Sequence, residues 1–136
     1  MIVVDTNVIA YLFITGDHTE LVQRVLAKDA DWLVPPLWQS EFRNVLVQYL
    51  RHQIITLEDA RIIYKEAAAF LDGQAFSVYT DQVLHLAATS NCSAYDCEFV
   101  ALARDFGVPL LTTDKRILRD FPETAVLPAD FVNDVG

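Results

Sequence analysis

Short apolar runs rich in β-branched residues alternate along this chain with longer segments of helical periodicity. The runs lie at residues 2–4, 32–34, 75–78, 108–112 and 125–127. This alternation is typical of an α/β domain with a parallel sheet, because each helix returns the chain to the start of the next strand. The sequence therefore predicts a three-layer α/β/α sandwich around a central, mostly parallel sheet of about five strands.

Helical segments are expected between these runs. Thr56 and Asp59 have the spacing of a capping box, Pro36 suits the first position of a helix, and Gly107 suits the end of one. The chain after residue 127 is expected to be a tail. The predicted helices cover residues 6–13, 19–28, 36–52, 56–71, 80–90 and 93–106, with a short one after Asp114.

Length and composition favour one well-packed domain over residues 1–136. Hydrophobic residues make up 53% of the chain, slightly above the globular norm. No stretch approaches the ~20 apolar residues of a membrane span, and the N-terminus has no signal-peptide pattern. Cys92 and Cys97 are too few for a disulfide framework, so we expect thiols in a reducing cytoplasm.

The formal net charge of −9 constrains the function further. Proteins that bind nucleic acid by neutralising phosphates usually carry a basic patch. An acidic chain therefore either does not act on nucleic acid or uses a bound cation to supply positive charge locally.

Four acidic residues are the candidates for chemistry. Asp5 and Asp114 each follow a predicted strand, so they share one crevice if the two strands are neighbours. Glu41 and Asp96 each border the apolar face of a predicted helix. Carboxylates at the edge of a core must be paired, protonated or bound to a cation.

A divalent cation is the partner that this set of side chains favours. Two carboxylates about 4 Å apart repel each other by roughly 4 kcal/mol at an effective dielectric of 20. Lys115 and Arg116 adjoin Asp114 but cannot neutralise all four acids. Oxygen ligands suit Mg²⁺ or Mn²⁺, and the three histidines, which are scattered along the chain, show no zinc-ligand spacing.

Each acid also has a purely structural interpretation. Asp5 and Asp114 are suited to cap the helices that follow them. Asp96 lies three residues after Ser93, which is the spacing of a capping box. Glu41 lies in a first helical turn, where the macrodipole favours negative charge. For any one acid alone, the sequence leaves both interpretations open.

Three segments carry a family resemblance. They read VVDTNVIAYL around Asp5, PPLWQSEFRNVL around Glu41, and AYDCEFVALARDFGVPLLTTDKRIL around Asp96 and Asp114. In this order they resemble the PIN-domain family, and within it the VapC-type toxin ribonucleases of toxin–antitoxin pairs. The resemblance implies a PIN-like sandwich and a metal-dependent endoribonuclease.

The resemblance also implies roles for individual residues. It assigns the binding of one or two Mg²⁺ or Mn²⁺ ions to Asp5, Glu41, Asp96 and Asp114. The implied reaction is hydrolysis of an RNA phosphodiester, which leaves a 5′-phosphate and a 3′-hydroxyl. Glu41 is either a ligand through water or the general base, and the sequence does not decide between these roles.

Thr6 and Thr112 match family positions whose hydroxyls orient acids or water, and Asn7 matches a position that braces the site. Ordinary turn and cap hydrogen bonding is the alternative for all three. Some family members carry a further acid just after the fourth one, whereas Lys115 follows Asp114 here. This departure argues against a permanently occupied second metal site.

The expected partners are an RNA substrate, a second copy of the chain in a homodimer, and a cognate antitoxin whose C-terminal segment lies in the active-site groove. Two other functions were considered. A phospho-signalling receiver domain would need paired acids after its first strand, where Asp5 stands alone. A catalytically silent PIN-like RNA-binding module would bind RNA without cleaving it.

Overall fold

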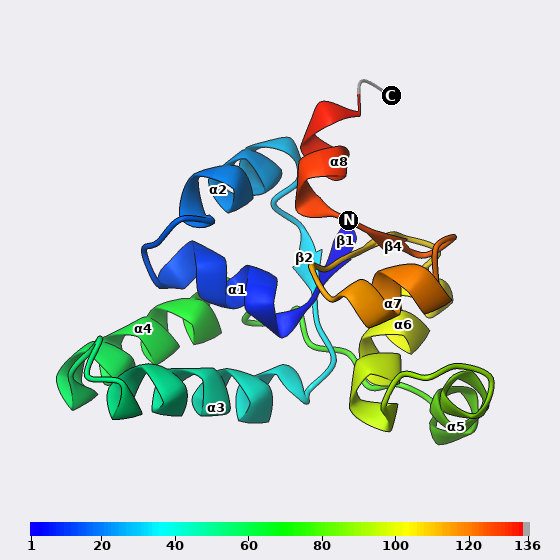
Figure 1. The fold of residues 1–136 in the computed structure, drawn as a ribbon, viewed down its shortest axis with the longest axis horizontal. Coiled ribbons are helices and arrows are strands. Elements are labelled where there is room, and N and C mark those ends of the chain that lie inside the picture. Colours follow the sequence, from blue (N-terminus) through cyan, green and yellow to red (C-terminus); the bar gives the residue numbers. More distant parts are fainter. Residues whose placement is uncertain (135–136) are drawn as a thin grey trace.

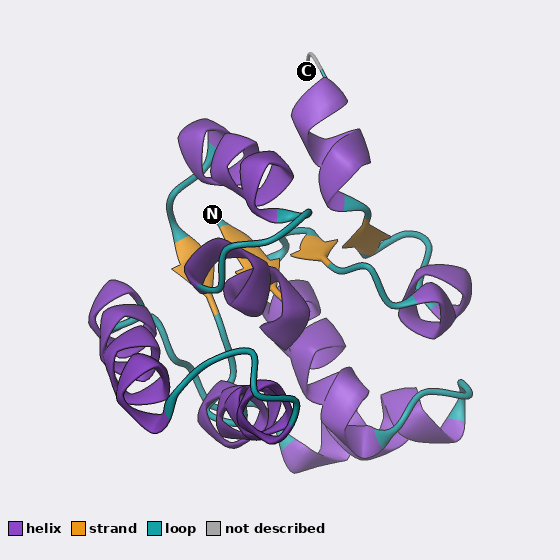
Figure 2. Cartoon of the chain, turned by 60° about the vertical axis from the view of Figure 1, so that its left-hand side comes forward, coloured by secondary structure: helices purple, strands orange, loops and turns teal. Residues whose placement is uncertain are grey.

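A computed structural model describes residues 1–134. Its sheet has four parallel strands, β1 (Ile2–Val4), β2 (Trp32–Leu33), β3 (Leu110–Leu111) and β4 (Ala125–Val126). The spatial order is β2-β1-β3-β4, with β1 at the centre beside β3 (Figure 2). The predicted α/β class is confirmed, with four strands instead of about five.

Helices cover both faces of this sheet, which gives the three predicted layers (Figure 1). The helices α1 to α4 and α8 pack on the face that carries Ile2 and Val4, and α5 to α7 pack on the face that carries Val3. The alternation follows from the pleat, which points successive side chains to opposite faces. The bounds are α1 (Thr6–Phe13), α2 (Thr19–Lys28), α3 (Trp38–Arg51), α4 (Leu57–Phe70), α5 (Thr80–Ala88), α6 (Ala94–Phe106), α7 (Lys115–Asp120) and α8 (Pro128–Asn133).

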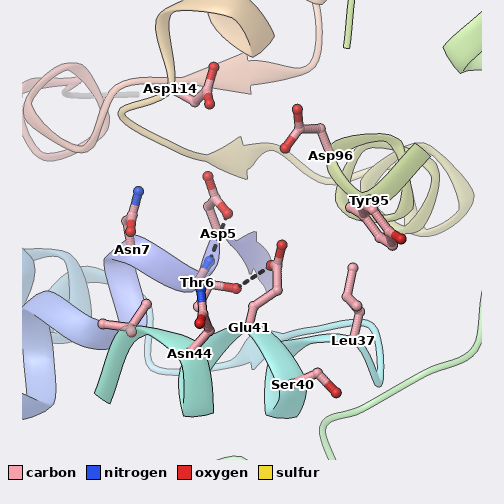
Figure 3. A pocket seen from close by; sticks show the side chains of 11 residues that line it. Asp5, Thr6, Asn7, Leu37, Ser40, Glu41, Asn44, Tyr95, Asp96 and Asp114 are labelled. Atoms are coloured by element: carbon pink, nitrogen blue, oxygen red, sulfur yellow. Dashed lines mark hydrogen bonds between the residues drawn. The ribbon is translucent and has the colours of Figure 1, made fainter. Parts of the chain in front are cut away.

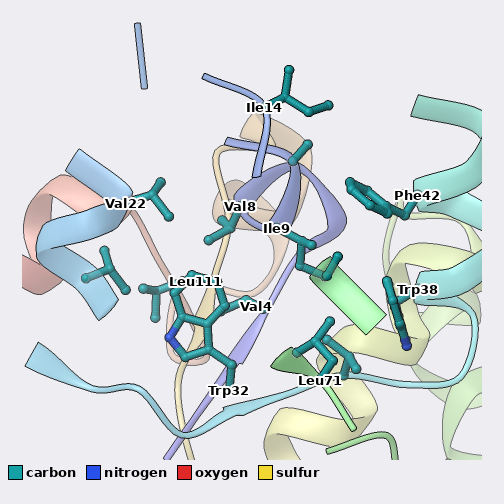
Figure 4. Packing of buried hydrophobic residues seen from close by; sticks show 14 of the residues in the cluster. Val4, Val8, Ile9, Ile14, Val22, Trp32, Trp38, Phe42, Leu71 and Leu111 are labelled. Carbon is teal, nitrogen blue, oxygen red and sulfur yellow. The ribbon is translucent and has the colours of Figure 1, made fainter. Parts of the chain in front are cut away.

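The larger of the two cores anchors α3, which bears one of the candidate acids. Trp38 and Phe42 of α3 are buried in this core, and Trp32 of β2 is fully buried in another part of it, near Val4 and Leu111 (Figure 4). Burying aromatic side chains of this size contributes several kcal/mol relative to leaving them exposed. The apolar stripe of α3 therefore fixes the orientation of the helix, and with it the position of Glu41 at the border of that stripe.

Local sequence signals fix several helix ends as predicted. In the Thr56–Asp59 capping box each residue's side chain accepts a hydrogen bond from the other's backbone N–H, both at 3.0 Å. Gly107 ends α6 with a φ of 65°, in the left-handed region that glycine adopts without a Cβ clash. The start of α3 differs from the prediction: Pro36 lies in a turn, and the helix begins at Trp38.

The predicted strand at residues 75–78 is wrong as a strand. Only Ala75 forms a bridge, with Val34. The Val34 N–H donates to the carbonyl of Gln74, and the Phe76 N–H donates to the carbonyl of Val34. The ladder stops there because Pro35 and Pro36 follow Val34 and have no N–H to continue it. The expected tail after residue 127 is also wrong, since α8 forms from Pro128 at its N-terminus and packs against α2.

Both cysteines are buried and unpaired. Within the described part of the chain, every helix is too short or too polar to cross a membrane.

Candidate active site

Asp5 and Asp114 come together because their strands are neighbours. β1 and β3 pair in register, with Val4 opposite Leu111, and each acid follows the carboxyl end of its strand. Asp5 caps α1 by accepting the backbone N–H of Thr6 on Oδ1 at 2.7 Å. Asp114 caps α7 by accepting two backbone N–H groups on its Oδ1, at 2.9 and 3.1 Å.

Thr112 forms a hydrogen bond with each of these two acids. Its buried hydroxyl donates to Asp5 Oδ2 at 2.7 Å and accepts the backbone N–H of Asp114 at 3.0 Å. The hydroxyl therefore has one donor and one acceptor partner and holds the ends of β1 and β3 in a fixed relation. Thr112 does not line the cleft itself.

Thr6 plays the matching part for Glu41. Its hydroxyl donates to Glu41 Oε1 at 2.7 Å, across from α1 to α3 (Figure 3). Because Thr6 is buried at the first position of α1, the bond fixes one oxygen of a carboxylate that comes from a different helix. Glu41 Oε2 has no hydrogen bond with any residue in the described range.

Asp96 reaches the same place from the opposite face of the sheet. It lies in the first turn of α6 and forms the capping box with Ser93, whose hydroxyl accepts the Asp96 N–H at 3.0 Å. The return bond, from the Ser93 N–H to Asp96 Oδ2, is longer at 3.4 Å. Asp96 therefore caps α6, as its structural interpretation predicted, and also lines the cleft.

All four acids line one cleft of about 380 Å³ at the carboxyl edge of the sheet (Figure 3). Thr6 and Asn7 line it too. Sequence reasoning missed Leu37, Ser40, Asn44, Val45 and Tyr95, which also line it. The signal was available on α3, because Leu37, Asn44 and Val45 lie four before, three after and four after Glu41, the spacings that share a helix face.

Burial and mutual repulsion both act on these carboxylates. Burial raises the pKa of Asp5 above its ordinary value, the hydrogen bonds from Thr112 and Thr6 oppose the rise, and the charges of Asp96 and Asp114 add to it. Burial likewise raises the pKa of Glu41, against the hydrogen bond from Thr6. No Lys, Arg or His is among the described residues that line the cleft. The negative charges of the four acids are therefore not balanced by a basic side chain there.

The chemistry of the donors fits a hard divalent cation, since the acids offer only oxygen ligands. The spacing of the acidic side chains is wider than an ion would need. Among residues 1–134, no three His, Cys, Asp or Glu side chains stand close enough together, as they lie, to hold an ion. The structure thus brings the four predicted acids into one cleft but not into one ligand shell, and binding an ion requires their side chains to close on it.

Comparison with known proteins agrees with this architecture. The family model of the PIN domain matches residues 2–124. Ribonuclease VapC3 of Pyrobaculum aerophilum is 26% identical over 124 residues, which cover 89% of this chain and 95% of that protein.

Two solved structures share the fold at low identity. FitAcB from Neisseria gonorrhoeae has a TM-score of 0.75 and 15% identity, with 95% of this chain and 99% of that chain covered. PAE2754 from Pyrobaculum aerophilum has a TM-score of 0.72 and 16% identity, with coverages of 96% and 92%. Because the family model spans nearly the whole chain and the neighbours reproduce its sheet and layers, the chain belongs to the PIN domain family.

Proposed function

We propose that this chain is a Mg²⁺- or Mn²⁺-dependent endoribonuclease. The observation that carries the proposal is the meeting of Asp5, Glu41, Asp96 and Asp114, which come from four separate segments, in one cleft without a neutralising basic side chain. Membership of the PIN domain family and the likeness to a protein described as a ribonuclease support it. Family membership also removes the reason to consider a receiver domain.

In this proposal Asp5, Asp96 and Asp114 hold the ion, and Glu41 either reaches it through water or acts as the general base. A bound divalent ion supplies positive charge for the phosphate and lowers the pKa of an attacking water. Glu41 Oε1 is fixed by Thr6, which leaves Oε2 to take a proton from that water. The water oxygen forms a bond to phosphorus as the P–O3′ bond breaks, and the departing O3′ takes up a proton from solvent, which leaves a 5′-phosphate and a 3′-hydroxyl.

The biological setting is part of the same proposal. The likeness to the VapC-type proteins suggests a cytoplasmic toxin that forms a homodimer and is held inactive by a cognate antitoxin. A cleft lined by acids and no bases suits a basic inhibitory arm. Co-purification of a small basic protein from the native host supports this, and its absence under gentle lysis counts against it.

Cleavage of an end-labelled single-stranded RNA tests the proposed activity. We expect cleavage in Mn²⁺ that is lost in EDTA and reduced by at least about 100-fold in Asp5→Asn and Asp96→Asn. Asp59→Asn is the matched control, because Asp59 has the same capping-box position at the start of α4 but lies outside the cleft. Binding of RNA without Mn²⁺-dependent cleavage would instead favour the silent binding module.

A further inference from the structure

An aromatic side chain stands at the mouth of the acidic cleft without a role in the proposed hydrolysis. Tyr95 is the residue directly before Asp96 on α6, and it is 62% exposed. Leu37, at the N-cap of α3, lines the same cleft and points toward Tyr95 (Figure 3). The capping box of α6 fixes the backbone on both sides of Tyr95, so the point from which its ring projects is set by the helix.

A second hollow is lined by residues that adjoin these two in the sequence. It has a volume of about 420 Å³, and it is lined by Pro36 and Ala94, the residues directly before Leu37 and Tyr95. Leu37 and Tyr95 thus line the acidic cleft, and the residues directly before them line a mostly apolar hollow. The other lining residues are Ser77, Val78, Thr80, Val83, Leu84 and Glu98.

The charges of both hollows restrict what can bind along this path. Neither is lined by Lys, Arg or His within the described part of the chain, while Glu98 adds an acid to the second one. Neutralisation of phosphates, the usual source of affinity for nucleic acid, has no side chain to act through there. Aromatic faces offer another source, because unpaired bases stack on them without needing a positive charge.

We propose that Tyr95, with Leu37 beside it, is the stacking platform for a nucleobase of single-stranded RNA next to the scissile phosphate, with the RNA continuing into the second hollow. This inference rests on the proposed ribonuclease function and adds to it the residue that binds the base beside the scissile phosphate. A paired base is excluded, since both of its faces are covered by neighbouring base pairs. Tyr95 is a substrate-positioning residue in this account.

Steady-state cleavage by Tyr95 variants tests the platform. Tyr95→Ala and Tyr95→Leu, which keeps apolar bulk but has no aromatic face, are each expected to raise KM about 5- to 100-fold with kcat changed less than about threefold. Tyr95→Phe is expected to stay within about twofold of the unmodified chain. Leu57→Ala is the control, because Leu57 is 55% exposed and neither it nor its chain neighbours line either hollow.

A substrate with one abasic residue on either side of the mapped cleavage site identifies stacking itself. Removing the stacked base should raise KM for the unmodified chain and for Tyr95→Phe, but should add little to the effect of Tyr95→Ala, since the two changes remove the same contact. Equal KM values for Tyr95→Ala and Leu57→Ala, or effects of the abasic residue and of Tyr95→Ala that simply multiply, would overturn the proposal.

A binding measurement separates this inference from the ribonuclease proposal. If the unmodified chain does not cleave RNA in Mn²⁺, the proposed function fails. Stacking on Tyr95 is then tested by titrating the chain into RNA that contains the fluorescent base 2-aminopurine. Fluorescence quenching by the unmodified chain and by Tyr95→Phe, absent with Tyr95→Ala and Tyr95→Leu, supports stacking. Equal signals from all four proteins contradict it.

Discussion

Asp96, Asp114 and Glu41 each use one carboxylate oxygen for hydrogen bonds within the described part of the chain, whereas both oxygens of Asp5 accept one, from the Thr6 N–H and the Thr112 hydroxyl. Asp114 caps α7 through Oδ1 alone, and Glu41 uses Oε1 for Thr6. In the first three acids one oxygen thus holds the side chain in place, while the other is available to the cleft. The capping and catalytic interpretations that the sequence left open therefore do not exclude each other, and the cap supplies the rigidity that a functional carboxylate needs.

The raised pKa values of Asp5 and Glu41 predict how stability depends on pH without metal. Both lie above the ordinary values of 3.8 and 4.5 mainly because of burial, so the folded chain binds protons more readily than the unfolded chain. The free energy of unfolding should then fall as pH rises from these ordinary values through the native ones. Asp59 and Asp120, with lowered pKa values, act in the opposite sense only below about pH 3.8.

Thermal melts in EDTA between pH 4.5 and 8 measure this dependence. The unmodified chain should lose stability toward higher pH, and Asp5→Asn with Glu41→Gln should show a flatter profile. A steeper loss in the double variant than in the unmodified chain would show that other groups cause it.

Thr112 gives a second prediction at the residue scale. Thr112→Val keeps the volume but removes the donor to Asp5 and the acceptor for the Asp114 N–H. We expect a loss of about 1–3 kcal/mol in the free energy of unfolding, since a buried carboxylate and a backbone N–H lose a partner. Urea denaturation measures it, with Thr113→Val as the adjacent control. Equal stability of the two variants would contradict the assigned role.

At the element scale, the helices were more predictable than the strands. The capping box of α4 and the glycine after α6 are local signals, and both act as the sequence indicated. The strand expected at residues 75–78 does not form. Its partner segment continues from Val34 into Pro35 and Pro36, which end the ladder after one bridge. Pairing depends on residues some 40 positions away, which a local pattern does not report.

The start of α6 allows capping to be separated from metal binding. Ser93→Ala removes the cap acceptor and should cost about 1 kcal/mol of stability while leaving the stabilisation by Mn²⁺ intact. Asp96→Asn should lose most of that stabilisation, which at 100 times the dissociation constant is about 2.7 kcal/mol, or roughly 9 °C in Tm for a chain of this size. Thermal melts with and without Mn²⁺ measure both. An equal Mn²⁺ response in the two variants would leave Asp96 with capping alone.

At the scale of the whole molecule, the sheet order decides which distant residues meet. β1 lies between β2 and β3, and this places Asp5 beside Asp114 although they are 109 positions apart in the sequence. The sequence predicted the four acids because strand ends and apolar helix faces mark them. It did not reveal Tyr95 or Ser40, because an exposed side chain at a helix start carries no signal until the opposite wall of the cleft is known.

The net charge of −9 has its counterpart in the cleft, where acids gather without bases. This concentration of charge is the reason that a cation is the expected partner, and the open arrangement of the side chains means that the partner must draw them together. The central claim is therefore that one divalent ion is shared by acids from opposite layers of the sandwich.

Anomalous diffraction from crystals of the chain soaked in MnCl₂ tests this claim most directly. We expect a manganese peak in the cleft with carboxylate oxygens of Asp5, Asp96 and Asp114 within about 2.5 Å of it, and Glu41 within reach of the ion directly or through one water. A cleft without manganese, at a concentration that supports RNA cleavage, would contradict it.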